Sequence, residues 1–454
     1  MKNQTKDSGP VISFDNRINL GLAAWFAMFC SILIWNQSNL RAGELGDSNN
    51  YYRIVLVLFA ALASSIALAS NYRRWSQAFP APLLLLLVYG LTALCSSVFV
   101  PTYAFFSMWK SFEILVDVLV IAAVLSYENP QNTARAAYRM LVVLYGLLIV
   151  IYLLEGLAMP KLAFQESRGY LSVYMLGVLP LMTQNALAFL SAVCAFAIVC
   201  KLQRPSLLVT KLVFAFMLGL AVITLVLAQS RTSVIALVLA LLVYLLFNRR
   251  YTLLCVLIVT GLAATFFTSL YDTSYQYLLR GQDTKLVTTL SGRTEGWEKA
   301  WRAFLESPIM GNGFAAFARA NILANDMSSM HGAVFDVIVG TGLMGFIPWA
   351  AAILWTVLRL VRLPLIGHAW FESNVGRSIQ AEMIGIAVLI LVRASTSSGL
   401  ALHQDNFMLF LTVLAYVTSM RHAVESQASE PNAVSVNTVK TRSPLPLRPA
   451  NISS

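Results

Sequence analysis

Long apolar runs separated by short polar segments fill the chain between residues 18 and 420. A helix crosses the hydrocarbon core of a bilayer with about 20 predominantly apolar residues. Windows of this kind lie at 18–37, 52–70, 81–100, 104–126, 139–158, 179–200, 207–228, 232–247, 251–269, 332–358, 380–399 and 405–420. They predict an all-α integral membrane protein with about 12 transmembrane helices. The sixth window is the least regular, because 170–180 could form a re-entrant or interfacial segment before a helix that starts near Thr183.

The basic residues predict the orientation, because loops on the cytoplasmic side of a membrane carry an excess of Lys and Arg. With the N-terminus inside, every inner segment carries at least two basic residues, whereas the short outer loops carry few. We therefore expect both termini in the cytoplasm and an uncleaved first span. Inner-loop arginines and lysines also account for most of the net charge of +11, so we expect no nucleic-acid partner.

The predicted spans divide the chain into five parts. We expect a cytoplasmic N-terminal tail at 1–17, spans one to nine at 18–268, a large periplasmic loop at 269–331, spans ten to twelve at 332–420 and a disordered cytoplasmic tail at 421–454. Aromatic and apolar residues recur at helical spacing within the loop, which predicts a short helix on the membrane surface; they are Trp297, Trp301, Phe304 and Leu305. Pro308 and the turn formed by Gly311, Asn312 and Gly313 should end this helix.

Composition agrees with a membrane protein, since 58% of the residues are hydrophobic and only 12% are charged. Soluble domains carry roughly 25% charged residues. This excludes an ordinary soluble enzyme and a disordered chain. No group of Cys, His or carboxylate residues has the spacing of a metal site, so we expect neither a metal nor a cofactor.

Charges inside the predicted spans need an explanation, because an unpaired charge in a bilayer is costly. Lys110, Glu113 and Asp117 follow one another at i+3 and i+4, which places them on one face of the fourth span. They could form a self-neutralising pair that locks the helix into the bundle, or line a polar cavity open to the outside. The two interpretations are compatible.

Other polar groups gather at the predicted outer face. Arg231 opens span eight, and Arg393 near the end of span eleven either lines a cavity or extends to the surface. His331 begins span ten with Asp336 five residues later, and His403 near Asp405 is a weaker candidate. Guanidinium forks suit diphosphate oxygens, and a histidine can accept a proton from a hydroxyl. These groups favour glycosyl transfer from a polyprenyl diphosphate to a hydroxyl acceptor.

Three segments resemble the O-antigen ligase and O-antigen polymerase superfamily of bacterial membrane glycosyltransferases. The first is Gln229-Ser230-Arg231-Thr232-Ser233, and the second is 291–317, SGRTEGWEKAWRAFLESPIMGNGFAAF. The third is His331-Gly332 followed by Asp336, Gly340, Gly342 and Gly345. Asn185-Ala186-Leu187 is also similar to a family feature.

The resemblance implies an undecaprenyl-diphosphate-linked glycan as donor and inverting, metal-independent transfer at the periplasmic face of the bacterial inner membrane. Arg231 and Arg293 would bind the diphosphate. His331, oriented by Asp336, would act on the acceptor hydroxyl, Gly311 and Gly313 would shape the loop, and Arg393, Lys110 and Glu113 would line the cavity.

The acceptor stays open at the level of sequence. Gly332 stands where many ligases have asparagine, which favours a polymerase of exopolysaccharide or O-antigen repeats over a ligase that joins polymer to lipid A core. A flippase for lipid-linked glycans or a solute transporter, with Lys110, Glu113 and Asp117 as a midplane relay, is the alternative from another class. The long outer loop and the few charges in the inner halves of the spans favour the enzyme.

Overall fold

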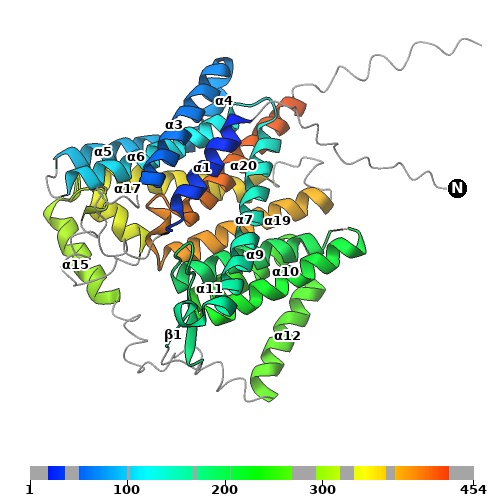
Figure 1. The fold of residues 1–454 in the computed structure, drawn as a ribbon. Coiled ribbons are helices and arrows are strands. Elements are labelled where there is room, and N and C mark those ends of the chain that lie inside the picture. Colours follow the sequence, from blue (N-terminus) through cyan, green and yellow to red (C-terminus); the bar gives the residue numbers. More distant parts are fainter. Residues whose placement is uncertain are drawn as a thin grey trace, which may run out of the picture.

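The computed structural model describes residues 19–35, 51–99, 103–166, 171–204, 206–267, 293–316, 332–363 and 374–428, and these residues are mostly helical (Figure 1). Six of the described helices are long and apolar enough to cross a membrane. They are α3 (Tyr51–Ser70), α5 (Ala81–Phe99), α7 (Pro130–Ala158), α9 (Gln184–Leu202), α10 (Leu208–Leu227) and α17 (Ala333–Arg362).

The remaining predicted windows also contain helices. These are α1 (Leu20–Ile32), α6 (Ala104–Leu125), α11 (Arg231–Phe247), α12 (Tyr251–Phe267), α19 (Asn374–Ala394) and α20 (Asp405–Ala428). The prediction of a polytopic helical membrane protein is therefore confirmed. The last helix continues to Ala428, beyond the point at which the sequence pattern placed the start of the tail.

The helices differ in how much protein surrounds them. In α9, 72% of the most apolar window is buried inside the protein, whereas in α10 only 17% is buried. α9 packs against α7, α10, α11 and α19 and is thus central, while α10 presents apolar side chains outward. α12 packs mainly on α11 and projects from the other helices (Figure 1). Outward apolar faces of this kind suit contact with lipid.

A small β-hairpin departs from the all-α expectation. β1 (Phe164–Glu166) pairs antiparallel with β2 (Val173–Met175) between α7 and α9. The segment that follows is fastened by Glu155, whose carboxylate accepts the backbone N–H groups of Val178 and Leu179 at 2.9 Å each. α9 then begins at Gln184 with Thr183 as its N-cap, as the sequence predicts. Strands of three residues are too short to show an alternating pattern.

α17 is interrupted at Gly342, where φ is 60° and ψ is −162°. The loop that follows α15 (Arg293–Glu306) satisfies the backbone groups at this break. The carbonyls of Pro308 and Ile309 accept from the amides of Leu343 and Met344 at 2.9 and 3.2 Å. The Asn312 amide donates to the Val339 carbonyl at 2.7 Å. The loop is therefore docked into the broken helix.

The predicted glycine turn lies at this contact. Gly311 has φ of 74° and Gly313 has φ of 91°, a region that favours glycine. A Cβ on Gly311 would lie 2.6 Å from the backbone nitrogens of Thr341 and Gly342. The close approach of two backbones thus requires a residue without a side chain at position 311.

We expect Gly311→Ala to destabilise the protein by about 1–3 kcal/mol, because alanine brings both an unfavourable φ and a clash with α17. The measurement is the thermal unfolding of the purified protein in detergent. Gly219→Ala is the matched control, since a Cβ on this glycine of α10 would meet nothing within 4 Å. Equal stability of the two variants would contradict the docked loop.

Candidate functional site

Three segments that are distant in the sequence meet at the start of α17. The Trp297 ring of α15 stacks on Phe335 of α17, with centroids 5.4 Å apart and an interplanar angle of 17°. A Cβ built on Gly332 would lie 3.5 Å from Trp297 Nε1 and 3.7 Å from the carbonyl oxygen of Ser395, which follows α19. The structure therefore brings α15, the entry to α17 and the exit from α19 together.

Asp336 lies in the first turn of α17, at this meeting point. Its carboxylate interacts with the side chain of Ser398, which begins the short 3₁₀ helix η4 (Ser398–Leu400). The other carboxylate oxygen, Oδ2, is buried and has no hydrogen-bond partner among the described residues. His331 and the side chain of Arg293 lie outside the part of the chain that the structure describes; the backbone of Arg293 begins α15.

α15 packs on α17 more closely than the sequence indicates. Ala300, Ala303 and Phe304 lie against Ile338 and Val339 of α17. Phe304 is only 7% exposed, so it faces protein and not the membrane surface. Trp301 and Leu305 remain 49% and 59% exposed. The residues expected to form one aromatic face therefore lie on two faces of α15.

Arg231 begins α11, directly after a turn that is fixed by Gln229. Gln229 has φ of 49°, and its side-chain amide donates to the carbonyls of Leu171 and Val173 at 3.2 and 2.6 Å. The turn between α10 and α11 is thus attached to the β-hairpin. α11 packs along α9 and α19, so the position of Arg231 follows from three neighbouring elements.

Arg393 is buried, with 8% of its surface exposed. Its guanidinium lies over the Phe189 ring of α9, 6.0 Å from the centroid, and interacts electrostatically with Asp405 at the start of α20. The alternative that Arg393 extends to the surface is therefore wrong. Arg393 connects α9, α19 and α20.

Lys110 and Glu113 form the ion pair that their spacing predicts, with Nζ 2.8 Å from Oε2. Glu113 also accepts a hydrogen bond from Trp109 Nε1 at 2.9 Å and lies 3.8 Å from the guanidinium of Arg53 on α3. The sequence pattern alone did not identify Arg53 as a partner. Its position at the start of a span, on the predicted outer side, was the available signal.

Asp117 pairs with His403, a residue that the sequence made only a weaker candidate. His403 Nδ1 lies 2.9 Å from Asp117 Oδ2, and its Nε2 lies 2.9 Å from the Ser31 hydroxyl. Both side chains of this hydrogen-bonded pair are fully buried. The Ser31 carbonyl accepts from Arg53 Nε at 2.8 Å, so one network joins α1, α3, α6 and the entry to α20. This arrangement supports the structural interpretation of the charges on α6.

Among the described residues, no three His, Cys, Asp or Glu side chains lie close enough together to hold a metal ion. The candidate site consists of its arginines, Asp336 and the aromatic contact of α15 with α17.

Comparison with known proteins decides the family of the central segment. Residues 216–350 match the family model Wzy_C, described as O-Antigen ligase. This segment is an O-antigen ligase family domain. It runs from α10 into α17 and includes Arg231, Arg293, His331 and Asp336, whereas Arg393 and the network of α6 lie outside it. A search of curated proteins gives no match to the chain.

The O-antigen ligase domain implies a multi-pass membrane enzyme that transfers glycans in polysaccharide or lipopolysaccharide biosynthesis, with lipid-linked glycans as substrates. The resemblance seen in the sequence is confirmed by this match.

We expect His403→Ala to destabilise the protein by about 3–5 kcal/mol, because it leaves the buried Asp117 carboxylate without its partner. The measurement is the unfolding of the detergent-solubilised protein. Glu128→Gln is the control, since Glu128 is 82% exposed in its pair with Arg74 and such pairs contribute little. If both variants lose the same small amount of stability, the buried network does not hold the helices together.

Proposed function

We propose that the protein is a membrane glycosyltransferase that moves an undecaprenyl-diphosphate-linked glycan onto a sugar hydroxyl of an acceptor at the periplasmic face. The observation that carries this proposal is the O-antigen ligase domain at 216–350, which contains every residue of the diphosphate and acceptor hypothesis. The contacts of Trp297, Gly332 and Ser395 support it, because they bring α15, the entry to α17 and the exit from α19 together, and two of these three segments carry proposed site residues.

Arg231 and Arg293 are the proposed diphosphate ligands. Each is the first residue of a helix, Arg231 in α11 and Arg293 in α15. The free amides and the dipole at a helix N-terminus favour an anion, and a guanidinium adds a bidentate fork. Two such positions would neutralise the charge that develops on the departing diphosphate.

His331 is the proposed base, with Asp336 as its orienting partner. The acceptor oxygen would attack the anomeric carbon as the bond to the diphosphate oxygen breaks, and its proton would pass to His331. Attack on the face opposite the leaving group inverts the anomeric carbon, and no metal is needed for this step. The buried Oδ2 of Asp336, which has no hydrogen-bond partner among the described residues, supports an orienting role.

We further propose twelve spans, with both termini in the cytoplasm of a bacterial inner membrane, the loop 269–331 in the periplasm and the tails at 1–17 and 421–454. Two sets of contacts support this topology. Ser31 at the end of α1, Arg53 at the start of α3 and His403 just before α20 lie in one network, at helix ends assigned to the outside. Arg204 and Tyr138 both contact Glu382 at ends assigned to the inside.

Gly332 favours a polymerase of exopolysaccharide or O-antigen repeats, with a glycan as acceptor, over a ligase that uses lipid A core. A deletion strain separates the two on surface-glycan gels. Lipopolysaccharide that carries a single repeat indicates an O-antigen polymerase, and loss of a secreted polymer alone indicates an exopolysaccharide polymerase. Lipid-linked polymer that accumulates beside bare lipid A core indicates a ligase.

We expect His331→Ala to lower glycan transfer at least about 100-fold, because it removes the group that accepts the proton. The measurement is product formation by purified protein with a lipid-diphosphate donor, together with the level of protein in the membrane. His422→Ala, on the predicted cytoplasmic side, is the control and should retain activity. Full activity of the His331 variant would remove the catalytic assignment.

We expect Arg231→Lys to raise the KM for the donor about tenfold, because lysine keeps the charge but loses the bidentate fork. Arg293→Ala should also raise the KM for the donor, because it removes the guanidinium altogether. Lys299→Ala removes a charge from an exposed position of α15 and should change the KM little. Purified protein that carries solute across vesicles without a glycan product would establish the transporter instead.

A further inference from the structure

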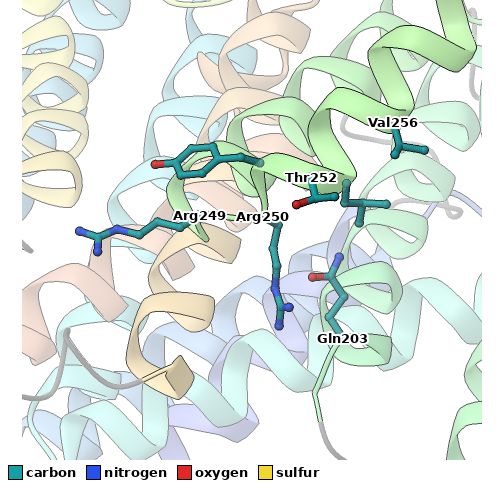
Figure 2. Close-up of a pocket in the computed structure, with 7 residues that line it drawn as sticks. Gln203, Arg249, Arg250, Thr252 and Val256 are labelled. Atoms are coloured by element: carbon teal, nitrogen blue, oxygen red, sulfur yellow. The ribbon is translucent and has the colours of Figure 1, made fainter.

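A second basic site lies at the opposite end of α11 from Arg231. A pocket of about 580 Å³ is lined there by Gln203, Arg249, Arg250, Tyr251, Thr252, Leu253 and Val256 (Figure 2). α11 has 17 residues, which corresponds to about 25 Å at about 1.5 Å per residue. The pocket is therefore separate from the proposed diphosphate site, and glycosyl transfer gives it no role.

The turn between α11 and α12 presents two consecutive arginines. The Arg249 amide donates to the Leu246 carbonyl at 3.1 Å, and the Arg250 amide donates to the Leu245 carbonyl at 2.9 Å. This is the Schellman pattern, in which the residue in the left-handed conformation is usually glycine. Arg249 takes that place with φ of 56°. Glycine would end the helix with less strain, because it has no Cβ. The arginine side chain at this position therefore suggests a role in binding an anion.

Acidic side chains do not appear among the seven described residues that line this pocket. A comparable pair, Arg73 and Arg74, lies beside a pocket of about 330 Å³ that includes Glu128, and Arg74 Nη2 is 3.1 Å from the Glu128 carboxylate. A carboxylate therefore neutralises one of the two arginines at that pocket, whereas no carboxylate occurs among the described residues that line the pocket of Arg249 and Arg250.

The hydrogen-bonding groups of the pocket are mostly donors. Arg250 extends in the direction of Gln203, whereas Arg249 extends to the other side (Figure 2). The Gln203 amide and the Thr252 hydroxyl add neutral donors, and the first amides of α12 have no carbonyl partners within that helix. Guanidinium groups beside a helix N-terminus suit a phosphate group.

One wall of the pocket is apolar. Leu253 and Val256 of α12 line it and are 42% and 53% exposed. Because α12 is an apolar helix in a membrane protein, its first turn lies near the depth of lipid headgroups. A ligand that fits both walls carries a phosphate at one end and hydrocarbon at the other.

We propose that this pocket binds the phosphate headgroup of an anionic glycerophospholipid, with the acyl chains along α12. The Arg250 guanidinium holds the phosphate, and Gln203 and Thr252 donate to its remaining oxygens. Arg249, which extends to the other side of the turn, adds positive charge beside the site. Leu253 and Val256 contact the first carbons of the chains. The arginines then serve as a specific lipid site in addition to any effect on topology.

The test is native mass spectrometry of the full-length protein titrated with phosphatidylglycerol or with phosphatidylcholine. Arg249→Gly with Arg250→Gln removes both charges, and the glycine suits the turn, so the fold should be kept. We expect this variant to bind phosphatidylglycerol about tenfold more weakly. We also expect wild-type binding to prefer phosphatidylglycerol over phosphatidylcholine and to weaken as salt is raised.

Arg73→Gln with Arg74→Gln is the matched control, because it removes the same charge from another turn on the same predicted face and should change binding less than about twofold. Arg250→Gln alone leaves the turn untouched and should weaken binding by several-fold. Three results would overturn the proposal: unchanged binding in the Arg249 and Arg250 variants, an equal loss in the control, or displacement of the lipid by inorganic phosphate at comparable concentration.

Discussion

A break in a membrane helix must find hydrogen-bond partners within the protein, because lipid supplies none. In α17 the break at Gly342 is satisfied by the loop after α15, whose carbonyls accept from Leu343 and Met344. This contact fixes the loop, and the loop fixes α15 along α17. Trp297 then stacks beside the entry to α17, where Gly332 and Asp336 lie. The geometry of the candidate site thus depends on the satisfied break.

The same constraint governs the charged side chains. Glu113 and Asp117 are buried on one face of α6, and each has a cationic or hydrogen-bonding partner from another element. Because the partners come from α3 and from the entry to α20, neutralising the charges also sets the positions of those helices. Arg393 does the same between α9, α19 and α20. Polar groups that are costly in a bilayer therefore act as specific connections between helices.

Local patterns predicted much of this fold, and long-range partners were beyond them. The apolar windows, the start of α9 after Thr183 and the end of α15 before Pro308 follow from spacing and capping along a short stretch of chain. His403 and Asp117 are 286 residues apart, so no local pattern joins them. The sequence held only an indirect signal for this pair. Asp117 lies within a predicted span and no basic residue is close to it along the chain, so its partner had to come from a distant segment. The β-hairpin was missed because its strands are too short for periodicity.

The two ends of α11 show how charge in a membrane protein can serve more than one purpose. Arg231 begins the helix inside the O-antigen ligase domain, while Arg249 and Arg250 follow its other end. The positive-inside rule explains why basic residues occur at that second end, but it treats every inner arginine alike. The surroundings distinguish them, since Arg74 lies against Glu128 and the wall around Arg250 contains no acid among the residues described. The orientation of the chain in the membrane therefore accounts for the number of inner arginines. An arginine that is paired with a nearby carboxylate only anchors the chain, whereas one without an acid in its surroundings can also bind an anion.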